Sequence, residues 1–256
     1  MLQLQRDCAI IIKISLIVNA LRAQARAQIY GEICEMYNCF LKRTADILVS
    51  ALAIILLALP MLIIAIAIKI DDPGPVFFKQ KRVGKKKDGE LTYFSILKFR
   101  SMKMSAPHDV PTHLLADPTQ HITRVGKFIR KTSLDELPQI YQVFIGKLSC
   151  VGPRPALWSQ YDLIEEREKY GANDVKPGIT GLAQINGRDE LEIDVKAKYD
   201  GEYAAALRAG RFKGALMDIR CVLGTFSSVI GSRGVVEGGT GELKREEEKK
   251  KEEISK

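Results

Sequence analysis

The sequence is poor in the residues that build covalent or metal cross-links. It contains five cysteines and three histidines among 256 residues, and no two cysteines form a CxxC pair. An odd number of scattered cysteines in a chain of this size predicts neither a disulfide framework nor a zinc site, and it favours a reducing, cytosol-facing environment. All three histidines lie in the stretch from Ser105 to His121, where their spacing matches no zinc pattern and several prolines predict a surface loop.

The chain also lacks the features of a nucleic-acid-binding or secreted protein. Aromatic residues make up only 7% of the sequence and are scattered, with no base-reading motif, so we expect no nucleic-acid partner. The apolar stretch from Ala9 to Val18 is broken by Lys13 and is not followed by a small-residue cleavage site, which argues against a cleavable signal peptide. The formal charge of +8 therefore favours other polyanions, such as anionic lipid headgroups or phosphorylated substrates.

The length and composition favour one domain with extensions. An apolar content of 46% in 256 residues is enough for one substantial core. We predict a catalytic domain at residues 71–241, preceded by a membrane helix at 41–70. Residues 1–40 mix apolar and basic residues and are typical of an interfacial helix or a loose extension. Residues 242–256 are a block of glutamate and lysine, which predicts a disordered tail.

One long apolar run dominates the first third of the chain. From Ile47 to Ile68 only Ser50 and Pro60 interrupt it, and about 20 apolar residues suffice to cross a bilayer core. Positive flanks prefer the cytoplasmic face, so a segment that enters and leaves through the same leaflet would satisfy basic residues on both sides. The flanking cations are Arg22, Arg26, Lys42 and Arg43 before the run, and Lys69, Lys79, Lys81, Arg82, Lys85, Lys86 and Lys87 after it.

Pro60 lies in the middle of this apolar run. Proline removes one helix hydrogen bond and clashes with the preceding turn, so we expect a bend that could return the chain to its own leaflet. Proline kinks also occur in helices that span a membrane fully. The residues alone therefore leave a spanning helix and a re-entrant helix both open.

The remaining pattern predicts an α+β fold that is dominated by helices. Short apolar segments at Val76 to Phe78 and Leu91 to Leu97 lie on either side of a turn-rich stretch, which indicates a short β-hairpin. Helical periodicity covers Ile122 to Lys131, Leu137 to Ile145, Trp158 to Lys169 and Leu191 to Leu207. The stretch from Gly214 to Ile230 is typical of a surface amphipathic helix that rests on a membrane or on the core.

The segment Ser133-Leu134-Asp135-Glu136 has two interpretations. Ser-x-x-Glu matches a helix capping box, in which the acids would only stabilise the start of a helix. A phosphate-transfer site instead needs a nucleophile or base, cations that neutralise phosphate oxygens, and accessible backbone amides. Such cations recur at Lys98, Arg100, Arg130, Arg154 and Arg188, and the turn Lys176-Pro177-Gly178-Ile179-Thr180-Gly181 contains two glycines that let the backbone approach a ligand.

Several of these segments occur in an order that resembles the bacterial sugar transferase family, the monotopic phosphoglycosyl transferases. The resemblance runs from about Lys42 to Gly241. It is carried by Lys42-Arg43 with Asp46, Pro73-Gly74-Pro75-Val76-Phe77-Phe78, Lys98-Phe99-Arg100-Ser101-Met102, Ser133-Leu134-Asp135-Glu136-Leu137-Pro138-Gln139, Val151-Gly152-Pro153-Arg154-Pro155, the turn from Lys176 to Gly181, Gln184-Ile185-Asn186-Gly187-Arg188, and Asp200 three residues before Tyr203. Two positions depart from the family pattern: Ala58-Leu59 precede Pro60 where a serine is usual, and Leu182 stands where an aromatic residue is common.

The resemblance implies a reaction and a set of residue roles. Asp135 would be the nucleophile that attacks the β-phosphorus of a UDP-sugar, expels UMP and holds the phosphosugar until a polyprenyl (undecaprenyl) phosphate accepts it. Glu136 would position groups or assist proton movement, and a Mg²⁺ ion held partly by Asp135 would neutralise phosphate charge. The resemblance assigns phosphate or nucleotide contacts to Lys98, Arg100, Arg130, Arg154, Lys176 and Arg188, with Asp200 as a further acidic member of the site.

The resemblance also implies where the protein works. It favours a monotopic protein with a re-entrant helix broken near Pro60, on the cytoplasmic face of the bacterial inner membrane, at the first membrane step of glycan or exopolysaccharide assembly. Its partners would be the two substrates and the membrane, and a homo-oligomer stays open. The sugar is not predicted, because selectivity depends on the shape of a pocket. The alternative is a non-catalytic membrane-anchored scaffold, which binds anionic lipid and whose acid pair only caps a helix.

Overall fold

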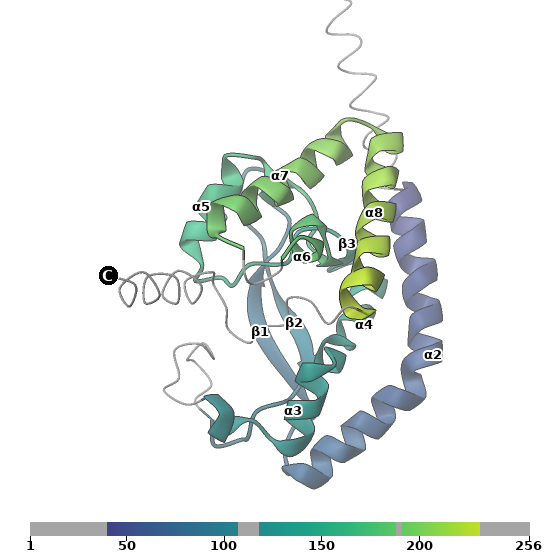
Figure 1. Ribbon diagram of the computed structural model, residues 1–256, viewed down its shortest axis with the longest axis vertical. Helices are drawn as coiled ribbons and strands as arrows, with labels where there is room; N and C mark the ends of the chain where they lie inside the picture. The colour runs from purple at the N-terminus through teal and green to yellow at the C-terminus, as the bar shows by residue number, and fades with distance from the viewer. Residues whose placement is uncertain (1–39, 107–117, 188–190, 231–256) are drawn as a thin grey trace, which may run out of the picture.

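The computed structural model describes residues 40–106, 118–187 and 191–230. The helices are α2 (Lys42–Asp71), α3 (Arg124–Lys131), α4 (Gln139–Phe144), α5 (Tyr161–Glu168), α6 (Leu182–Ile185), α7 (Ile193–Arg208) and α8 (Arg211–Ile230); the strands are β1 (Phe77–Val83), β2 (Tyr93–Phe99), β3 (Ser149–Val151) and β4 (Gly178–Thr180); the 3₁₀ helices are η3 (Pro118–His121), η4 (Leu134–Glu136) and η5 (Ala172–Asp174). These elements confirm a helix-dominated α+β fold (Figure 1). The predicted extension at 1–40, apart from Phe40, and the predicted tail at 242–256 lie outside the described residues.

Two separate two-stranded sheets bring distant segments together. β1 and β2 form the predicted antiparallel hairpin, in which Phe78 lies opposite Lys98. β3 and β4 form a parallel pair, in which Ser149 lies opposite Gly178. The sequence analysis does not predict this pair, because each strand has only three residues and too few positions to show an alternating pattern.

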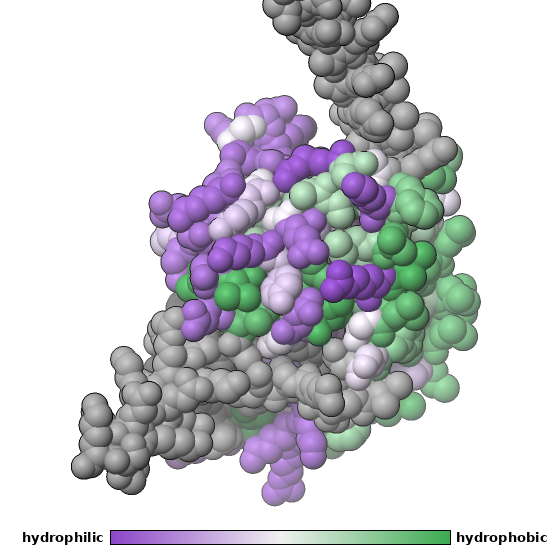
Figure 2. Space-filling view, turned by 45° about the horizontal axis from the view of Figure 1, so that its top comes forward, coloured by the Kyte–Doolittle hydropathy of each residue, from purple (hydrophilic) through white to green (hydrophobic). Residues whose placement is uncertain are grey.

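α2 is a 30-residue helix whose apolar side chains mostly face outward. The mean hydropathy of its most apolar 18-residue stretch is 3.1, and only 6% of that stretch is buried. Among the described residues, α2 is the one helix long and apolar enough to cross a membrane. The helix continues through Pro60, and Figure 1 shows α2 changing direction along its length. Figure 2 shows apolar side chains gathered along one side of the molecule, with hydrophilic ones over much of the rest of that face.

The first turn of α2 is attached to α8 and α4 by two basic residues. Lys42 Nζ lies 2.7 Å from Asp218 Oδ2 on α8. Arg43 donates hydrogen bonds of 2.6 Å to the carbonyl oxygens of Val143 and Phe144 at the end of α4. The Val143 carbonyl oxygen also accepts from the Gly146 N–H at 2.9 Å. Carbonyls in the last turn of a helix lack the N–H of a following turn, so the guanidinium supplies a partner there and holds the two helices together.

The last turn of α2 is attached to α3 and to the end of β2 by two acids. The backbone N–H of Val125, in the first turn of α3, donates to Asp71 Oδ2 at 2.8 Å. Asp72, just beyond the helix, forms an ion pair with Arg100, which follows β2. Arg100 also donates to the Asp72 carbonyl oxygen. Both ends of the apolar helix are therefore attached to one body.

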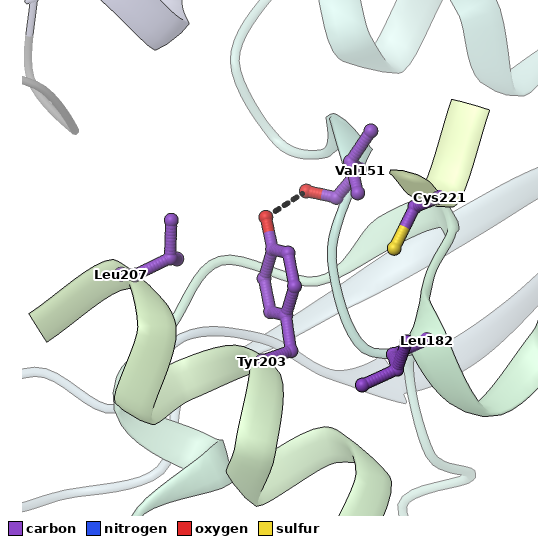
Figure 3. Packing of buried hydrophobic residues seen from close by; sticks show 5 residues of the cluster. All are labelled: Val151, Leu182, Tyr203, Leu207 and Cys221. Atoms are coloured by element: carbon purple, nitrogen blue, oxygen red, sulfur yellow. Dashed lines mark hydrogen bonds between the residues drawn. The ribbon is translucent and has the colours of Figure 1, made fainter. Parts of the chain in front are cut away.

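Two apolar clusters hold the elements that carry the site. The second half of α2 contributes Ile64 and Ile68 to a cluster with Phe99 of β2 and Ile129 of α3. The other cluster joins β3 to α6, α7 and α8 and consists of Val151, Leu182, Tyr203, Leu207 and Cys221 (Figure 3). In that cluster the Tyr203 hydroxyl donates to the Val151 carbonyl oxygen at 3.0 Å, which ties α7 to the end of β3.

Candidate active site

The acid pair follows α3 through a residue in the left-handed conformation. Ser133 has a φ of 55°, and the next three residues form the single turn of η4. The Ser133 side chain makes no capping hydrogen bond. The capping-box interpretation is therefore wrong, and the structure gives no support for an acid pair that only caps a helix.

Glu136 lies between two cations from distant segments. Lys98 Nζ donates to Glu136 Oε1 at 2.8 Å. Arg154 donates from Nη2 to the same oxygen at 2.7 Å and from Nη1 to Oε2 at 3.3 Å. Burial would raise the pKa of Glu136, but the charges and hydrogen bonds of Arg154 and Lys98 outweigh it and hold the pKa well below its usual range. Glu136 is therefore ionised and fixed in place.

Asp135 is held much more loosely than its neighbour. Lys98 Nζ lies 3.6 Å from Asp135 Oδ2, beyond normal hydrogen-bond length, and within the part of the chain that the structure describes no hydrogen bond engages this carboxylate. Its side chain is 13% exposed. Burial raises the pKa of Asp135; Lys98, Arg130 and Arg154 lower it and the Glu136 charge raises it further, with a net upward shift. Asp135 is thus the acid whose oxygens stay available to a ligand.

The side chains of Lys98 and Phe99, near the end of β2, point in different directions. Lys98 points to the acid pair, whereas the next residue, Phe99, is buried in the cluster with α2. Arg100 is buried, and its guanidinium is committed to Asp72. Lys98 is therefore the cation that this segment presents to the acids, and Arg100 instead anchors the end of α2. The predicted phosphate contact of Arg100 stays a prediction.

Arg154 projects from a loop whose backbone is held at every step. Its flanking residues are prolines, which fix φ and lack an N–H donor. Four consecutive carbonyl oxygens accept hydrogen bonds of 3.0 Å: Pro153 from Gly178 N–H, Arg154 from Arg167 Nη2, Pro155 from Arg82 Nη1, and Ala156 from Val83 N–H. We call residues Pro153 to Ala156 the arginine loop. Its conformation is set by β1, α5 and the segment that leads into β4.

Close backbone packing explains two glycines beside this loop. A Cβ on Gly152 would lie 2.4 Å from the Lys176 carbonyl oxygen, and one on Gly178 would lie 2.1 Å from the Gly152 nitrogen. Any larger residue would push β3 and β4 apart and would move the arginine loop away from Glu136. Gly178 and Gly181, the two glycines predicted to let the backbone approach a ligand, both pack closely on the backbone of Gly152; a Cβ on Gly181 would lie 2.2 Å from the Gly152 carbonyl oxygen.

Two functional arginines were not identified from the sequence, Arg167 and Arg82. Arg167 shares a helix face with Leu163 and Ile164, and all three are buried. An arginine on the apolar face of a predicted helix is a signal that could have found it. Arg82 lies in a run of basic residues, so nothing local distinguishes it from its neighbours.

The other residues predicted for the site lie in different parts of the structure. Arg130, in the last turn of α3, is close enough to lower the pKa of Asp135. Lys176 lies at the start of β4, in a pocket of about 310 Å³ that Lys42 and Arg43 also line, whereas Arg154 follows the far end of β3. Arg188 lies outside the described residues. Asp200 is fully buried on α7.

Asp200 contacts the acid pair only through other residues. Arg167 donates to Asp200 Oδ2 from Nε at 2.9 Å and from Nη2 at 2.5 Å. The same Nη2 holds the Arg154 carbonyl oxygen. Burial raises the pKa of Asp200, and the Arg167 charge acts against that shift. Asp200 is therefore the buried counter-ion of an arginine that braces the arginine loop.

A magnesium ion would fit the acid pair only together with a phosphorylated ligand. Mg²⁺ keeps several waters and usually takes one or two carboxylates plus phosphate oxygens. Asp135 can supply one such carboxylate, since no hydrogen bond within the described residues occupies it, whereas both Glu136 oxygens are taken by cations. Within the same described ranges no group of three or more His, Cys, Asp or Glu side chains forms a ready-made metal site.

The site and fold together define a class of protein. An outward-facing apolar helix is packed on a domain in which one carboxylate, without a hydrogen bond within the described residues, lies among Lys98, Arg130 and Arg154. Such a group can attack an electrophilic phosphorus while the cations neutralise its oxygens. A family model described as bacterial sugar transferase matches residues 37–232. The chain belongs to the bacterial sugar transferase family.

Named relatives are similar over this same region. The "UDP-galactose-lipid carrier transferase" of Erwinia amylovora is 41% identical over 184 residues, covering 64% of this chain and 36% of the relative. The "UDP-glucose:undecaprenyl-phosphate glucose-1-phosphate transferase" of Escherichia coli K12 is 42% identical, with 65% and 36% covered. The chain thus spans about a third of the length of these relatives. The "Exopolysaccharide production protein PSS" of Rhizobium leguminosarum bv. phaseoli is 39% identical over 198 residues, covering 74% of this chain and 95% of that relative.

Proposed function

We propose that the protein transfers a sugar-1-phosphate from a UDP-sugar to a polyprenyl phosphate, releasing UMP. The observation that carries this proposal is the difference between the two acids. Glu136 accepts hydrogen bonds from Arg154 and Lys98, while the Asp135 carboxylate has no hydrogen bond within the described residues. A structural ion pair would use both acids. The names of the relatives, which specify UDP-sugars and undecaprenyl phosphate, support the same substrate classes.

The transfer takes place in two displacements at one carboxylate. An Asp135 oxygen bonds to the β-phosphorus of the UDP-sugar, the bond from that phosphorus to the bridging oxygen breaks, and UMP leaves with the electron pair. An oxygen of the polyprenyl phosphate then attacks the same phosphorus. The Asp135 oxygen leaves, the carboxylate is regenerated, and the product is a polyprenyl diphosphate sugar.

Each cation has a task in these steps. Lys98 lies beside both acids, so it can neutralise a phosphate oxygen that approaches Asp135. Arg154 and Arg130 add positive charge around the same carboxylate. Asp135 is the residue that would hold a Mg²⁺ ion, and such an ion would supply further charge neutralisation. Glu136 keeps Lys98 and Arg154 in place, because an ionised acid between two cations removes their mutual repulsion.

The membrane placement that fits this reaction is re-entrant. A straight helix of 30 residues is about 45 Å long, and its ends would lie on opposite sides of a hydrocarbon core of about 30 Å. Both ends of α2 instead contact one domain, through Arg43 at the start and Asp72 at the end. This arrangement, with the change of direction along α2 in Figure 1, supports entry and exit through the cytoplasmic leaflet of the inner membrane.

Cysteine labelling in intact cells tests this topology. In a background without native cysteines, Ala45→Cys and Lys79→Cys are expected to resist a membrane-impermeant maleimide from outside and to react fully after lysis. Leu59→Cys is the control: its side chain is 66% exposed in the protein, so within lipid it should stay unlabelled until detergent is added. Labelling of either flank in intact cells would exclude the re-entrant topology.

Turnover by the wild-type protein tests the proposed reaction. Purified protein in nanodiscs is expected to release UMP from at least one member of a panel of UDP-sugars when undecaprenyl phosphate and Mg²⁺ are present, and to stop on addition of EDTA. Without the lipid, release should end near one UMP per protein, because the phosphosugar stays on the enzyme. Release of UDP in place of UMP would overturn the proposal, since the sugar alone would then be transferred.

A further inference from the structure

The buried pair of Arg167 and Asp200 is the feature that the reaction steps above leave unused. Arg167 is 4% exposed and Asp200 is not exposed. Taking two charges out of water is costly, and a purely apolar contact between α5 and α7 would often be as stable. A buried ion pair that adds little stability is more readily explained by what its second set of contacts achieves.

Arg167 makes that second contact with the backbone of the arginine loop. Its Nη2 is shared between Asp200 Oδ2 at 2.5 Å and the Arg154 carbonyl oxygen at 3.0 Å. Among the carbonyl oxygens of the loop, the Arg154 carbonyl belongs to the residue whose guanidinium donates to Glu136. Asp200 accepts from both Nε and Nη2 and so fixes the plane of the guanidinium, which gives the hydrogen bond to Arg154 a defined direction.

One face of α7 braces both ends of the segment that carries Arg154. Asp200 and Tyr203 are three residues apart and therefore lie on the same side of the helix. The Tyr203 hydroxyl lies 3.0 Å from the carbonyl oxygen of Val151, before the arginine loop, and 2.7 Å from Asp218 Oδ1, so these two acceptors share its single proton. Asp200 acts through Arg167 on Arg154 itself. The remaining carbonyls of the loop are held by β1 and by the backbone at Gly178.

We propose that Arg167, held by Asp200, is a positioning residue for the transfer: it fixes the backbone at Arg154 so that the Arg154 guanidinium stays on Glu136 and over the phosphate site. The proposal rests on the proposed function. It places the effect on the chemical step, because Arg167 is buried and acts on the acid pair through the backbone of Arg154. A loop that shifts by a fraction of an ångström would misplace charge in the transition state more than it would weaken substrate binding.

Arg167→Lys is the informative variant. Lysine keeps the positive charge beside Asp200 but lacks the planar fork that reaches Asp200 and the Arg154 carbonyl oxygen together. We expect kcat to fall ~10–100-fold, KM to change by less than about threefold, and the melting temperature to stay close to that of the wild type. The uncharged pair Arg167→Met with Asp200→Leu removes the buried charges altogether and should show the same loss of kcat in a folded protein.

Arg208→Lys is the matched control. Arg208 lies on α7 and donates to two backbone carbonyl oxygens just after α5, those of Tyr170 and Gly171, but it does not touch the arginine loop. Arg208→Lys removes the same kind of planar fork, and we expect kcat and KM to stay at wild-type values. A loss of kcat equal to that of Arg167→Lys would mean that general loosening between α5 and α7 explains both variants, and it would overturn the positioning role.

Amide hydrogen exchange at Gly178 tests the brace without any turnover. The Gly178 N–H donates to the Pro153 carbonyl oxygen, next to Arg154, so a loosened loop should expose it. We expect faster exchange at Gly178 in Arg167→Lys and unchanged exchange in Arg208→Lys. Unchanged exchange in Arg167→Lys, or faster exchange with wild-type kcat, would overturn the inference. Absence of UMP release by the wild type would sink the proposed function separately, whatever the exchange result.

Discussion

Asp135→Asn is expected to fold normally and to release UMP at least ~10⁴-fold more slowly than the wild type. Asparagine has nearly the size of aspartate but lacks the anionic oxygen that bonds to phosphorus. The fold should tolerate the change, because burial already raises the pKa of Asp135 and its ion pair with Lys98 is 3.6 Å long. A neutral side chain there removes a desolvation cost and breaks no hydrogen bond within the described residues.

Trapping with a sugar-labelled donor makes this prediction specific to one residue. Incubated without lipid acceptor, the wild type should carry the label on the peptide that contains Asp135, and Asp135→Asn should carry none. Asp194→Asn is the control, since its side chain is 53% exposed and pairs only weakly with Lys198 at 3.9 Å. Normal turnover by Asp135→Asn, or a label on Glu136, would remove the nucleophile assignment.

The long and regular elements could be predicted from the sequence. The long apolar run predicts the helix over Lys42–Asp71. Apolar segments on either side of a turn-rich stretch predict the hairpin, whose strands have seven residues each. Helices such as Ile193–Arg208 are long enough for the apolar period to be read. In all these cases the signal lies within one contiguous segment.

The contacts that shape the site could not be predicted in this way. β3 and β4 are three residues each, and the pairing of Ser149 with Gly178 depends on the whole fold between them. Arg167 and Arg82 act on the arginine loop from α5 and β1, and no spacing rule relates them to Arg154. Single-sequence patterns indicate which residues carry charge, whereas tertiary structure decides which carbonyl each charge reaches.

The capping box shows how a correct local pattern can lead to a wrong role. Ser133 and Glu136 have the right spacing, but Ser133 adopts a φ of 55° and the segment turns as a 3₁₀ helix. Glu136 gains more from two cations in a partly buried site than it would from one backbone N–H at an exposed helix end. Tertiary electrostatics therefore overrode the local preference.

The site and the membrane helix share one short segment, and this links reaction and location. Lys98 binds the acid pair, Phe99 packs on α2, and Arg100 holds Asp72 at the end of α2. Because these are consecutive residues, the acids that contact Lys98 are linked through this one segment to the C-terminal end of α2, which the proposed topology puts at the membrane surface. A lipid phosphate at the membrane surface is the kind of acceptor that such an arrangement can reach.

Glu136→Gln is expected to lower kcat ~100-fold, because it removes the charge that keeps Lys98 and Arg154 together. Arg154→Gln should cost a similar factor. If the two side chains act as one unit, the double variant should be no worse than either single variant, and the cycle should give a coupling of about 1–3 kcal/mol in transition-state stabilisation. Independent, additive losses would show that Glu136 does not work through Arg154.

The same variant has a defined dependence of stability on pH. Pairing lowers the pKa of folded Glu136 below its ordinary 4.5, so its contribution to stability is complete above that pH and is lost as pH falls towards the folded pKa. Glu136→Gln should therefore be less stable than the wild type at pH 7, and the gap should close on acidification below about pH 4.5. Glu168→Gln is the control: it breaks a 2.7 Å pair with Lys86 in which the side chains are 38% and 26% exposed, so solvent screens the loss. A gap that persists in acid would mean that packing, and not charge, holds Glu136 in place.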